Sequence, residues 1–240
     1  MRVAAVQFKA RKSDLASSRA ALVSLAAEAA EGADLVVLPE MAATGYIFAS
    51  AAEVAEVAEA PEGPTFQALS AVAARCGAWI VAGFPERAGS RLYNSALVID
   101  PTGALASVYR KRLLFEADEH WATPGDSGYQ RFETAAGAFG VGICMDLNDD
   151  RFLWWCARAR LDAVAFPTNW LEQGVDVARY WALRMMGQQA ALVAANTYGS
   201  EGEVAFAGRS CVLAGRTLLA MAPMEGDGVI RARLRTSRAG

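Results

Sequence analysis

Histidine is almost absent from this sequence. The 240 residues contain only one, His120, in the polar segment FEADEHW at 115–121. A Ser-His-Asp triad or a Cys-His pair would have to use this residue, but its charged and aromatic neighbours favour a solvated or structural role. Any nucleophile in this chain is therefore expected to rely on a base other than histidine.

Cysteine is sparse, and no two cysteines are close in the sequence. Cys76, Cys144, Cys156 and Cys211 lie far apart and form no CxxC pair. The usual zinc-site spacings are therefore excluded, and disulfides are not expected in a cytoplasmic chain. A buried cysteine is most often a small apolar core residue, which is our expectation for Cys76, Cys156 and Cys211. We predict no metal ion and no cofactor.

Long apolar runs and basic clusters are also lacking. No window approaches the length of a membrane span, and the first segment, MRVAAVQFKA, lacks the apolar region of a signal peptide. The longest basic run is RKR at 110–112, and the formal net charge is −3. We therefore expect a cytoplasmic protein that binds neither nucleic acid nor a membrane.

Short apolar runs, in contrast, are abundant and alternate with helical segments. Strands are predicted at 3–8, 34–40, 78–85, 94–100, 105–110, 139–146, 162–170 and 192–199, and helices at 14–32, 65–77, 151–160 and 175–191. The strands are apolar throughout rather than alternating, which is typical of sheets covered on both faces. This order predicts a layered α/β fold. Because there is no repeat or linker, we expect a single domain over residues 1–240.

Three polar sites follow directly on apolar runs. Glu40 ends LVVLPE, Cys144 ends GVGIC at 140–144, and the segment TNW at 168–170 follows AVAFP. In α/β sheets, ligands bind outside the carboxyl ends of strands, so these sites are candidates for a common pocket. The segment GVG at 140–142 is not a dinucleotide loop, because Met145 occupies the position of the third glycine in GxGxxG.

The acidic residues after Cys144 are expected to be structural. Asp149 or Asp150 can cap the predicted helix at 151–160. Asp146 can form an ion pair with Arg151. We assign no catalytic role to this acidic run.

A cysteine, a glutamate and a lysine suffice for amide hydrolysis. Only a thiolate attacks well, and a nearby ammonium lowers the thiol pKa while a carboxylate takes the proton. Attack on an amide develops negative charge on oxygen, which a lysine and a backbone N–H can stabilise. The carboxylate can then return the proton to the leaving amine. Cys144, Glu40 and Lys111 supply these groups at or just beyond strand ends.

Three motifs carry a family resemblance: LVVLPEMAATGY around Glu40, YRKRLLFEADEHWATPGD around Lys111 and GVGICMDLN around Cys144. With NSALVID, FPTNW, ANTYG and FAGRS in order, the chain resembles the nitrilase, or carbon–nitrogen hydrolase, superfamily over its whole length. The resemblance implies Glu40 as general base, Lys111 as oxyanion stabiliser and Cys144 as nucleophile. Glu119 matches a second glutamate that positions substrate and lysine. The family resemblance also implies a four-layer α-β-β-α sandwich. It further implies a homodimer formed through the helices that follow the lysine and cysteine motifs.

Within this family the Cys-Met-Asp-Leu-Asn form is most similar to protein N-terminal amidases. The substrate is expected to be a small linear amide or the side-chain amide of an N-terminal Asn or Gln, with its carbonyl oxygen between Lys111 and the Met145 N–H. Tyr46, Asn169 and Trp170 are candidate pocket walls. Three alternatives stay open: a nitrilase, an N-carbamoyl hydrolase with the same residues, and a non-catalytic binding module on this fold.

Overall fold

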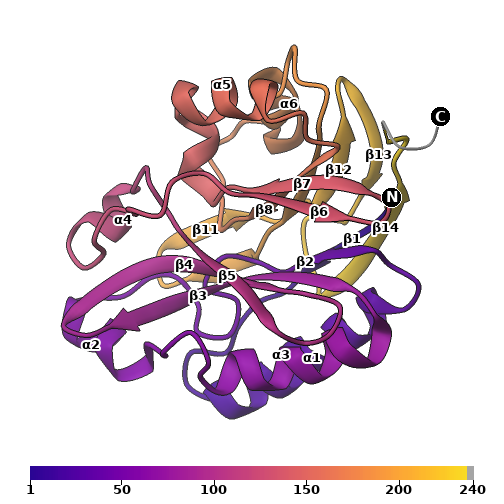
Figure 1. The fold of residues 1–240 in the computed structure, drawn as a ribbon. Coiled ribbons are helices and arrows are strands. Elements are labelled where there is room, and N and C mark those ends of the chain that lie inside the picture. The colour runs from indigo at the N-terminus through magenta and orange to yellow at the C-terminus, as the bar shows by residue number, and fades with distance from the viewer. Residues whose placement is uncertain (237–240) are drawn as a thin grey trace.

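Two six-stranded sheets form the centre of the protein (Figure 1). The structure is a computed structural model that describes residues 1–236. The first sheet has the order β14-β1-β2-β3-β4-β5, with strands β1 (Arg2–Gln7), β2 (Leu35–Val37), β3 (Trp79–Ala88), β4 (Arg91–Ile99), β5 (Leu105–Arg110) and β14 (Gly228–Arg233). The second has the order β13-β12-β9-β8-β7-β6, with strands β6 (Arg131–Thr134), β7 (Gly137–Val141), β8 (Ala163–Pro167), β9 (Ala191–Ala195), β12 (Cys211–Ala214) and β13 (Thr217–Met221).

Helices cover the outer face of each sheet. Figure 1 shows α1 and α3 against the first sheet and α5 and α6 against the second. The helical elements are α1 (Leu15–Ala30), α2 (Ala51–Val57), α3 (Pro64–Cys76), α4 (Glu116–Glu119), the 3-10 helix η1 (Cys144–Asn148), α5 (Asp150–Arg158) and α6 (Val177–Arg184). A separate hairpin joins β10 (Tyr198–Glu201) to β11 (Val204–Ala207).

Three apolar clusters fill the spaces between these layers. Leu22 and Leu69 hold α1 and α3 on the first sheet, Leu35 and Phe139 meet between the two sheets, and Trp181 packs α6 on the second sheet. Strands buried on both faces must be apolar throughout, which explains the continuous runs in the sequence. The predicted α-β-β-α sandwich is therefore confirmed.

Several predicted boundaries were wrong. The strand expected at 139–146 ends at Val141, and the chain then turns into η1. The helix expected at 175–191 covers only Val177–Arg184, because Asp176 caps its start and Gly187 adopts a positive φ of 85° soon after its end. The short elements α2 and β6 were not predicted, since segments of four to seven residues carry little periodicity.

The strand directions bring the candidate residues to one edge. Strand β2 is parallel to β3, and β5 runs in the same direction because two successive antiparallel pairings separate it from β3. Strands β7 and β8 are parallel in the other sheet. The segments that follow β2, β5, β7 and β8 carry Glu40, Lys111, Cys144 and Asn169, so the sheet topology places their backbones near each other.

Apolar side chains are exposed on the helices of the second sheet. Trp154 on α5, Leu183 on α6 and Met186 just beyond it are more than half exposed, at 66%, 57% and 65%. These helices follow the cysteine motif, where the dimer contact was expected; the homodimer stays a prediction. No helix within residues 1–236 is long and apolar enough to cross a membrane.

Candidate active site

A fully buried lysine lies between two carboxylates at the edge where the strands end. Lys111 Nζ is 2.7 Å from Glu40 Oε1 and 2.6 Å from Asp118 Oδ2, and all three side chains have no exposed surface. Burial by itself lowers the pKa of Lys111, but Asp118 and Glu40 together raise it well above its usual value. Lys111 is therefore a permanent cation inside the protein.

Two asparagines fix the orientation of Glu40. Asn94 Nδ2 donates to Glu40 Oε1 at 2.7 Å and to Asp118 Oδ1 at 3.0 Å. The Asn169 backbone N–H donates to Glu40 Oε2 at 2.8 Å, and Asn169 Nδ2 donates to the Glu40 carbonyl at 2.8 Å. Both carboxylate oxygens of Glu40 thus have defined partners, so one carboxylate position is strongly preferred.

The backbone beneath Glu40 is also constrained. A Cβ on Gly83 would lie 2.4 Å from the Glu40 Cα and 2.7 Å from the Met41 N. Met41, directly after Glu40, adopts a positive φ of 49°, a conformation that costs energy for a residue other than glycine. Strand β3 can therefore approach Glu40 this closely only with glycine at position 83.

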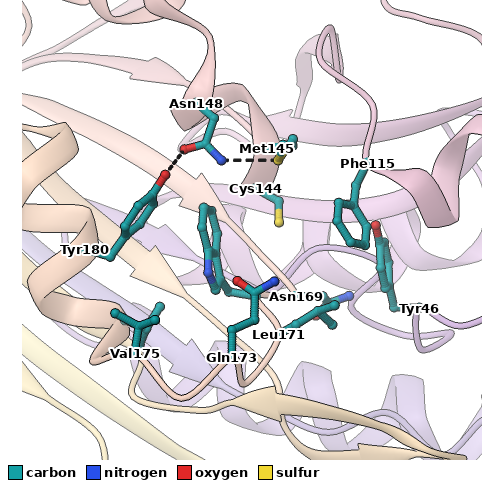
Figure 2. A pocket seen from close by; sticks show the side chains of 12 residues that line it. Tyr46, Phe115, Cys144, Met145, Asn148, Asn169, Leu171, Gln173, Val175 and Tyr180 are labelled. Atoms are coloured by element: carbon teal, nitrogen blue, oxygen red, sulfur yellow. Dashed lines mark hydrogen bonds between the residues drawn. The ribbon is translucent and has the colours of Figure 1, made fainter.

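Cys144 stands at a sharp turn in front of this cluster. Its φ is 43°, in the left-handed region, and it opens η1 just after strand β7. Figure 2 shows its sulfur turned into a pocket. Burial and the charge of Glu40 raise the pKa of the Cys144 thiol well above its usual value, while Lys111 acts in the opposite direction. The resting residue is a thiol, within the electrostatic influence of both partners.

The pKa of Glu40 is displaced in the same direction. Burial raises it, Lys111 lowers it, and Asp118 raises it, with a net increase above the usual value. A carboxylate with a raised pKa is a better proton acceptor. Glu40 is thus suited to receive a proton from the Cys144 thiol.

Asp118, and not Glu119, is the second acid at Lys111. Both belong to α4, a helix of one turn, where neighbouring side chains project about 100° apart. Asp118 turns inward, and its Oδ2 also accepts from the Phe115 backbone N–H at 3.1 Å. Glu119 lies exposed at the surface, so the position that the family resemblance assigned to it belongs to its neighbour. His120, next in the chain, is also exposed.

Asp146 joins the lysine segment to the cysteine turn. Its Oδ1 accepts from the backbone N–H groups of Arg112 and Leu113 at 3.0 and 2.9 Å, and its Oδ2 accepts from the Tyr109 hydroxyl at 2.8 Å and the Ile143 N–H at 3.0 Å. This fully buried carboxylate therefore holds the chain after β5 against the turn that carries Cys144.

The predicted ion pair between Asp146 and Arg151 was wrong. Arg151 pairs with Asp149, at 3.0 Å from Nε to Oδ1. Asp149 also caps α5 by accepting from the Arg151 backbone N–H at 2.9 Å, as one of the two expected caps. Asp146 is directed the other way because four donors surround it inside the fold.

The pocket in front of Cys144 has a volume of about 220 Å³. The residues expected near the substrate all line it: Tyr46, Met145, Asn169 and Trp170. Figure 2 shows the first three of them around the Cys144 sulfur. Within residues 1–236, no group of three or more His, Cys, Asp and Glu side chains is placed to hold a metal ion.

Asp118, Asn94 and Glu201 were missed by the sequence analysis. Asp118 is adjacent in sequence to Glu119, the residue that was predicted in its place. Asn94 is the first residue of the motif NSALVID. Glu201, on β10, accepts from the backbone N–H groups of Tyr46 and Ile47 with distances of 2.9 to 3.1 Å, and so fixes one pocket wall. Nothing local marks Glu201, since its partners lie more than 150 residues earlier.

Comparison with known proteins places nearly the whole chain in one family. Residues 2–240 match the family model described as carbon-nitrogen hydrolase. A nitrilase from Pyrococcus abyssi is 34% identical over 183 residues, covering 76% of this chain and 69% of the relative. A protein N-terminal amidase from Schizosaccharomyces pombe is 26% identical over 229 residues, covering 78% and 80%.

Solved structures agree on the fold. A mutant of the amidase from Nesterenkonia sp. AN1 superposes with a TM-score of 0.83 at 22% identity, covering 98% of this chain and 93% of that one. Together with the family match over nearly all residues, the two layered sheets and the buried Glu40–Lys111 pair establish that the chain belongs to the carbon–nitrogen hydrolase family of the nitrilase superfamily.

Proposed function

We propose that the protein is an amidase that hydrolyses a carboxamide to an acid and ammonia through a thioester on Cys144. One observation carries the proposal: a cysteine at the floor of a pocket adjoins a buried glutamate–lysine pair whose charges act on its thiol. The pair supplies a base and a cation, which are the two groups that this chemistry needs.

The first half of the reaction forms the thioester. Glu40 takes the proton of the Cys144 thiol as the sulfur attacks the amide carbon. The resulting oxyanion lies between Lys111 Nζ and the Met145 N–H, which offset its charge. Glu40 then gives the proton to the amide nitrogen, the C–N bond breaks, and ammonia leaves.

The second half releases the acid. Glu40 accepts a proton from water while the water oxygen attacks the thioester carbon. The tetrahedral intermediate again places its oxyanion against Lys111 and Met145. Collapse breaks the C–S bond, and the Cys144 sulfur regains its proton from Glu40. The raised pKa of Glu40 makes it a better proton acceptor in each half of the reaction, while burial opposes ionisation of the Cys144 thiol before the sulfur attacks.

Replacing Cys144 tests this mechanism directly. Cys144→Ala should reduce ammonia release by at least about 1,000-fold, since loss of a nucleophile abolishes the covalent route. Cys156→Ala, a buried cysteine of the α5 core, is the matched control and should retain turnover. Hydroxylamine should trap the acyl group of the wild type as a hydroxamate. Undiminished turnover by Cys144→Ala would refute the mechanism.

The same assay separates the alternatives. A nitrile that yields acid and ammonia would indicate a nitrilase, the name of the Pyrococcus abyssi relative. Release of carbon dioxide with ammonia would indicate an N-carbamoyl hydrolase. A binding module would show no turnover of amides, nitriles or carbamoyl compounds and no preferential labelling of Cys144 by iodoacetamide.

A further inference from the structure

Among residues 1–236, no charged side chain lines the pocket in front of Cys144. Beyond the predicted residues, five aliphatic or aromatic side chains among the described residues line it: Phe115, Leu171, Val175, Val177 and Tyr180. The ionised groups Glu40, Lys111 and Asp118 have no exposed side-chain surface and are not among the residues that line the pocket, so they can act on the scissile amide at its floor but do not form the wall around the rest of the acyl group.

Some polar atoms of the wall are engaged within the protein, whereas the Tyr46 hydroxyl and Asn169 Oδ1 have no hydrogen-bond partner among the described residues. Tyr180 donates its hydroxyl to Asn148 Oδ1 at 2.6 Å, and Asn148 Nδ2 points to the Met145 sulfur at 3.3 Å (Figure 2). Trp170 packs against Tyr180 with ring centroids 5.4 Å apart. Gln173 is a further amide of the wall; it is exposed at the mouth and turned into the pocket.

Charged groups lie on the far side of two valines of this wall. A neighbouring depression contains Glu172, Asp176 and Arg209 and shares Val175 and Val177 with the pocket. Arg209 Nη1 and Asp176 Oδ2 are 3.5 Å apart, so these two groups already compensate each other. A charge close to the scissile amide of a substrate would therefore find no counter-charge in the wall.

We propose that this pocket selects amides with an uncharged, apolar acyl group and discriminates against amides that carry an ammonium or a carboxylate near the reacting carbon. This inference rests on the proposed amidase function. Small-molecule pockets bury most of the ligand surface, and burial of an unpaired ion costs several kcal/mol. The N-terminal Asn or Gln of a peptide, which carries an α-ammonium, therefore belongs to the disfavoured class.

The buried charges make the selection asymmetric. Glu40 and Asp118 with Lys111 leave one net negative charge behind Cys144. That charge repels a carboxylate and attracts an ammonium weakly across the pocket floor. Amides with a carboxylate should therefore be the poorest substrates, and cationic amides should lie between them and the neutral ones.

Isosteric substrate pairs provide the test. Hexanamide matches 5-aminopentanamide, and 4-methylpentanamide matches succinamate, in number of heavy atoms. We expect kcat/KM for each charged member to be at least about 100-fold below its neutral partner, because an unpaired charge loses its hydration. Along propanamide, butanamide and pentanamide, kcat/KM should rise about fourfold per methylene, equivalent to about 0.8 kcal/mol.

Gln173 provides a variant with a predictable change in selectivity. Gln173→Glu places a carboxylate at the mouth and should raise the kcat/KM ratio of 5-aminopentanamide to hexanamide about tenfold, as expected for a partly screened ion pair. Gln173→Met has a similar length without charge and should leave that ratio within about twofold of the wild type.

The outcomes distinguish failure of this inference from failure of the amidase proposal. Equal or better turnover of the charged amides, with Cys144-dependent ammonia release, would overturn the selectivity and leave the amidase intact. If no amide is turned over, titration calorimetry can measure the affinity of the Cys144→Ala variant for the neutral and the charged member of each pair. This measurement tests the selectivity of the pocket without turnover. Tighter binding of the neutral members would support the selectivity of the pocket, and equal affinities would overturn it.

Discussion

Replacing Asp118 by asparagine removes one charge from the buried cluster at nearly constant side-chain size. Asp118 Oδ2 accepts from Lys111 Nζ and the Phe115 N–H, and its Oδ1 accepts from Asn94 Nδ2. An asparagine can present its oxygen to Lys111 and Phe115, but its NH2 group then faces the NH2 group of Asn94. The substitution therefore loses an ion pair and leaves two donors opposed.

The cost can be estimated from these contacts. A hydrogen bond to a charged group contributes about 1.5–3 kcal/mol, so we expect Asp118→Asn to lower the free energy of unfolding by about 2–3 kcal/mol. For a chain of this size, this corresponds to a decrease in Tm of about 5–10 °C. Loss of an oxyanion donor costs 100- to 1,000-fold in kcat. Because Lys111 keeps its ion pair with Glu40 but loses the one with Asp118, we expect kcat of Asp118→Asn to decrease about 100-fold.

The pH profile separates a role at Lys111 and Glu40 from a merely structural one. The negative charge of Asp118 raises the pKa of Glu40, and Glu40 must be ionised to take the thiol proton. Removal of that charge favours ionisation, so the pKa falls and the acid limb of kcat/KM moves to lower pH. Stopped ammonia assays across the acid limb measure this shift, and calorimetry measures Tm.

Glu119→Gln is the matched control for Asp118→Asn. Glu119 is adjacent in sequence and exposed, so we expect kcat/KM within about twofold of the wild type and little change in Tm, as for most surface substitutions. The assignment of Asp118 as the positioning residue would be refuted if Glu119→Gln decreased kcat/KM as much as Asp118→Asn. It would also be refuted if the acid limb of Asp118→Asn stayed in place.

Two further substitutions test how the backbone holds the site. Gly83→Ala introduces a Cβ at 2.4 Å from the Glu40 Cα, and we expect a loss of about 1–3 kcal/mol by thermal unfolding with a large decrease in kcat; Gly228→Ala, where a Cβ meets no atom within 4 Å, should change neither. Asp146→Asn presents an NH2 group to two of four donors and should cost about 2–4 kcal/mol, whereas the exposed Asp150→Asn should cost less than about 0.5 kcal/mol. If Gly83→Ala and Gly228→Ala lowered stability equally, the close approach of β3 to Glu40 would not explain the need for glycine. If Asp146→Asn and Asp150→Asn lowered stability equally, the four hydrogen bonds to Asp146 would not hold the cysteine turn.

Local patterns in the sequence are enough to predict the layered fold, and the sequence led us to propose Cys144, Glu40 and Lys111 as the reacting groups. Strands buried on both faces must be apolar over their length. The segments LVV at 35–37 and AVAFP at 163–167 can therefore be predicted as strands from the local sequence. Polar residues directly after such runs lie at the sheet edge by necessity. Glu40 and Cys144 could be proposed because each follows a buried strand, whereas Lys111 was proposed from the chemistry of the three groups together and from the family resemblance.

Tertiary structure decided which neighbours complete the site. Asp118 and Glu119 have the same charge and adjacent positions, and only the placement of α4 against Lys111 and Asn94 directs one inward and the other to solvent. Asp146 and Glu201 accept from donors far away in sequence. The absence of charge from the described pocket wall depends on which of the many charged side chains turn away. These contacts join segments that local patterns cannot relate, because their distance and orientation are set only when the two sheets pack.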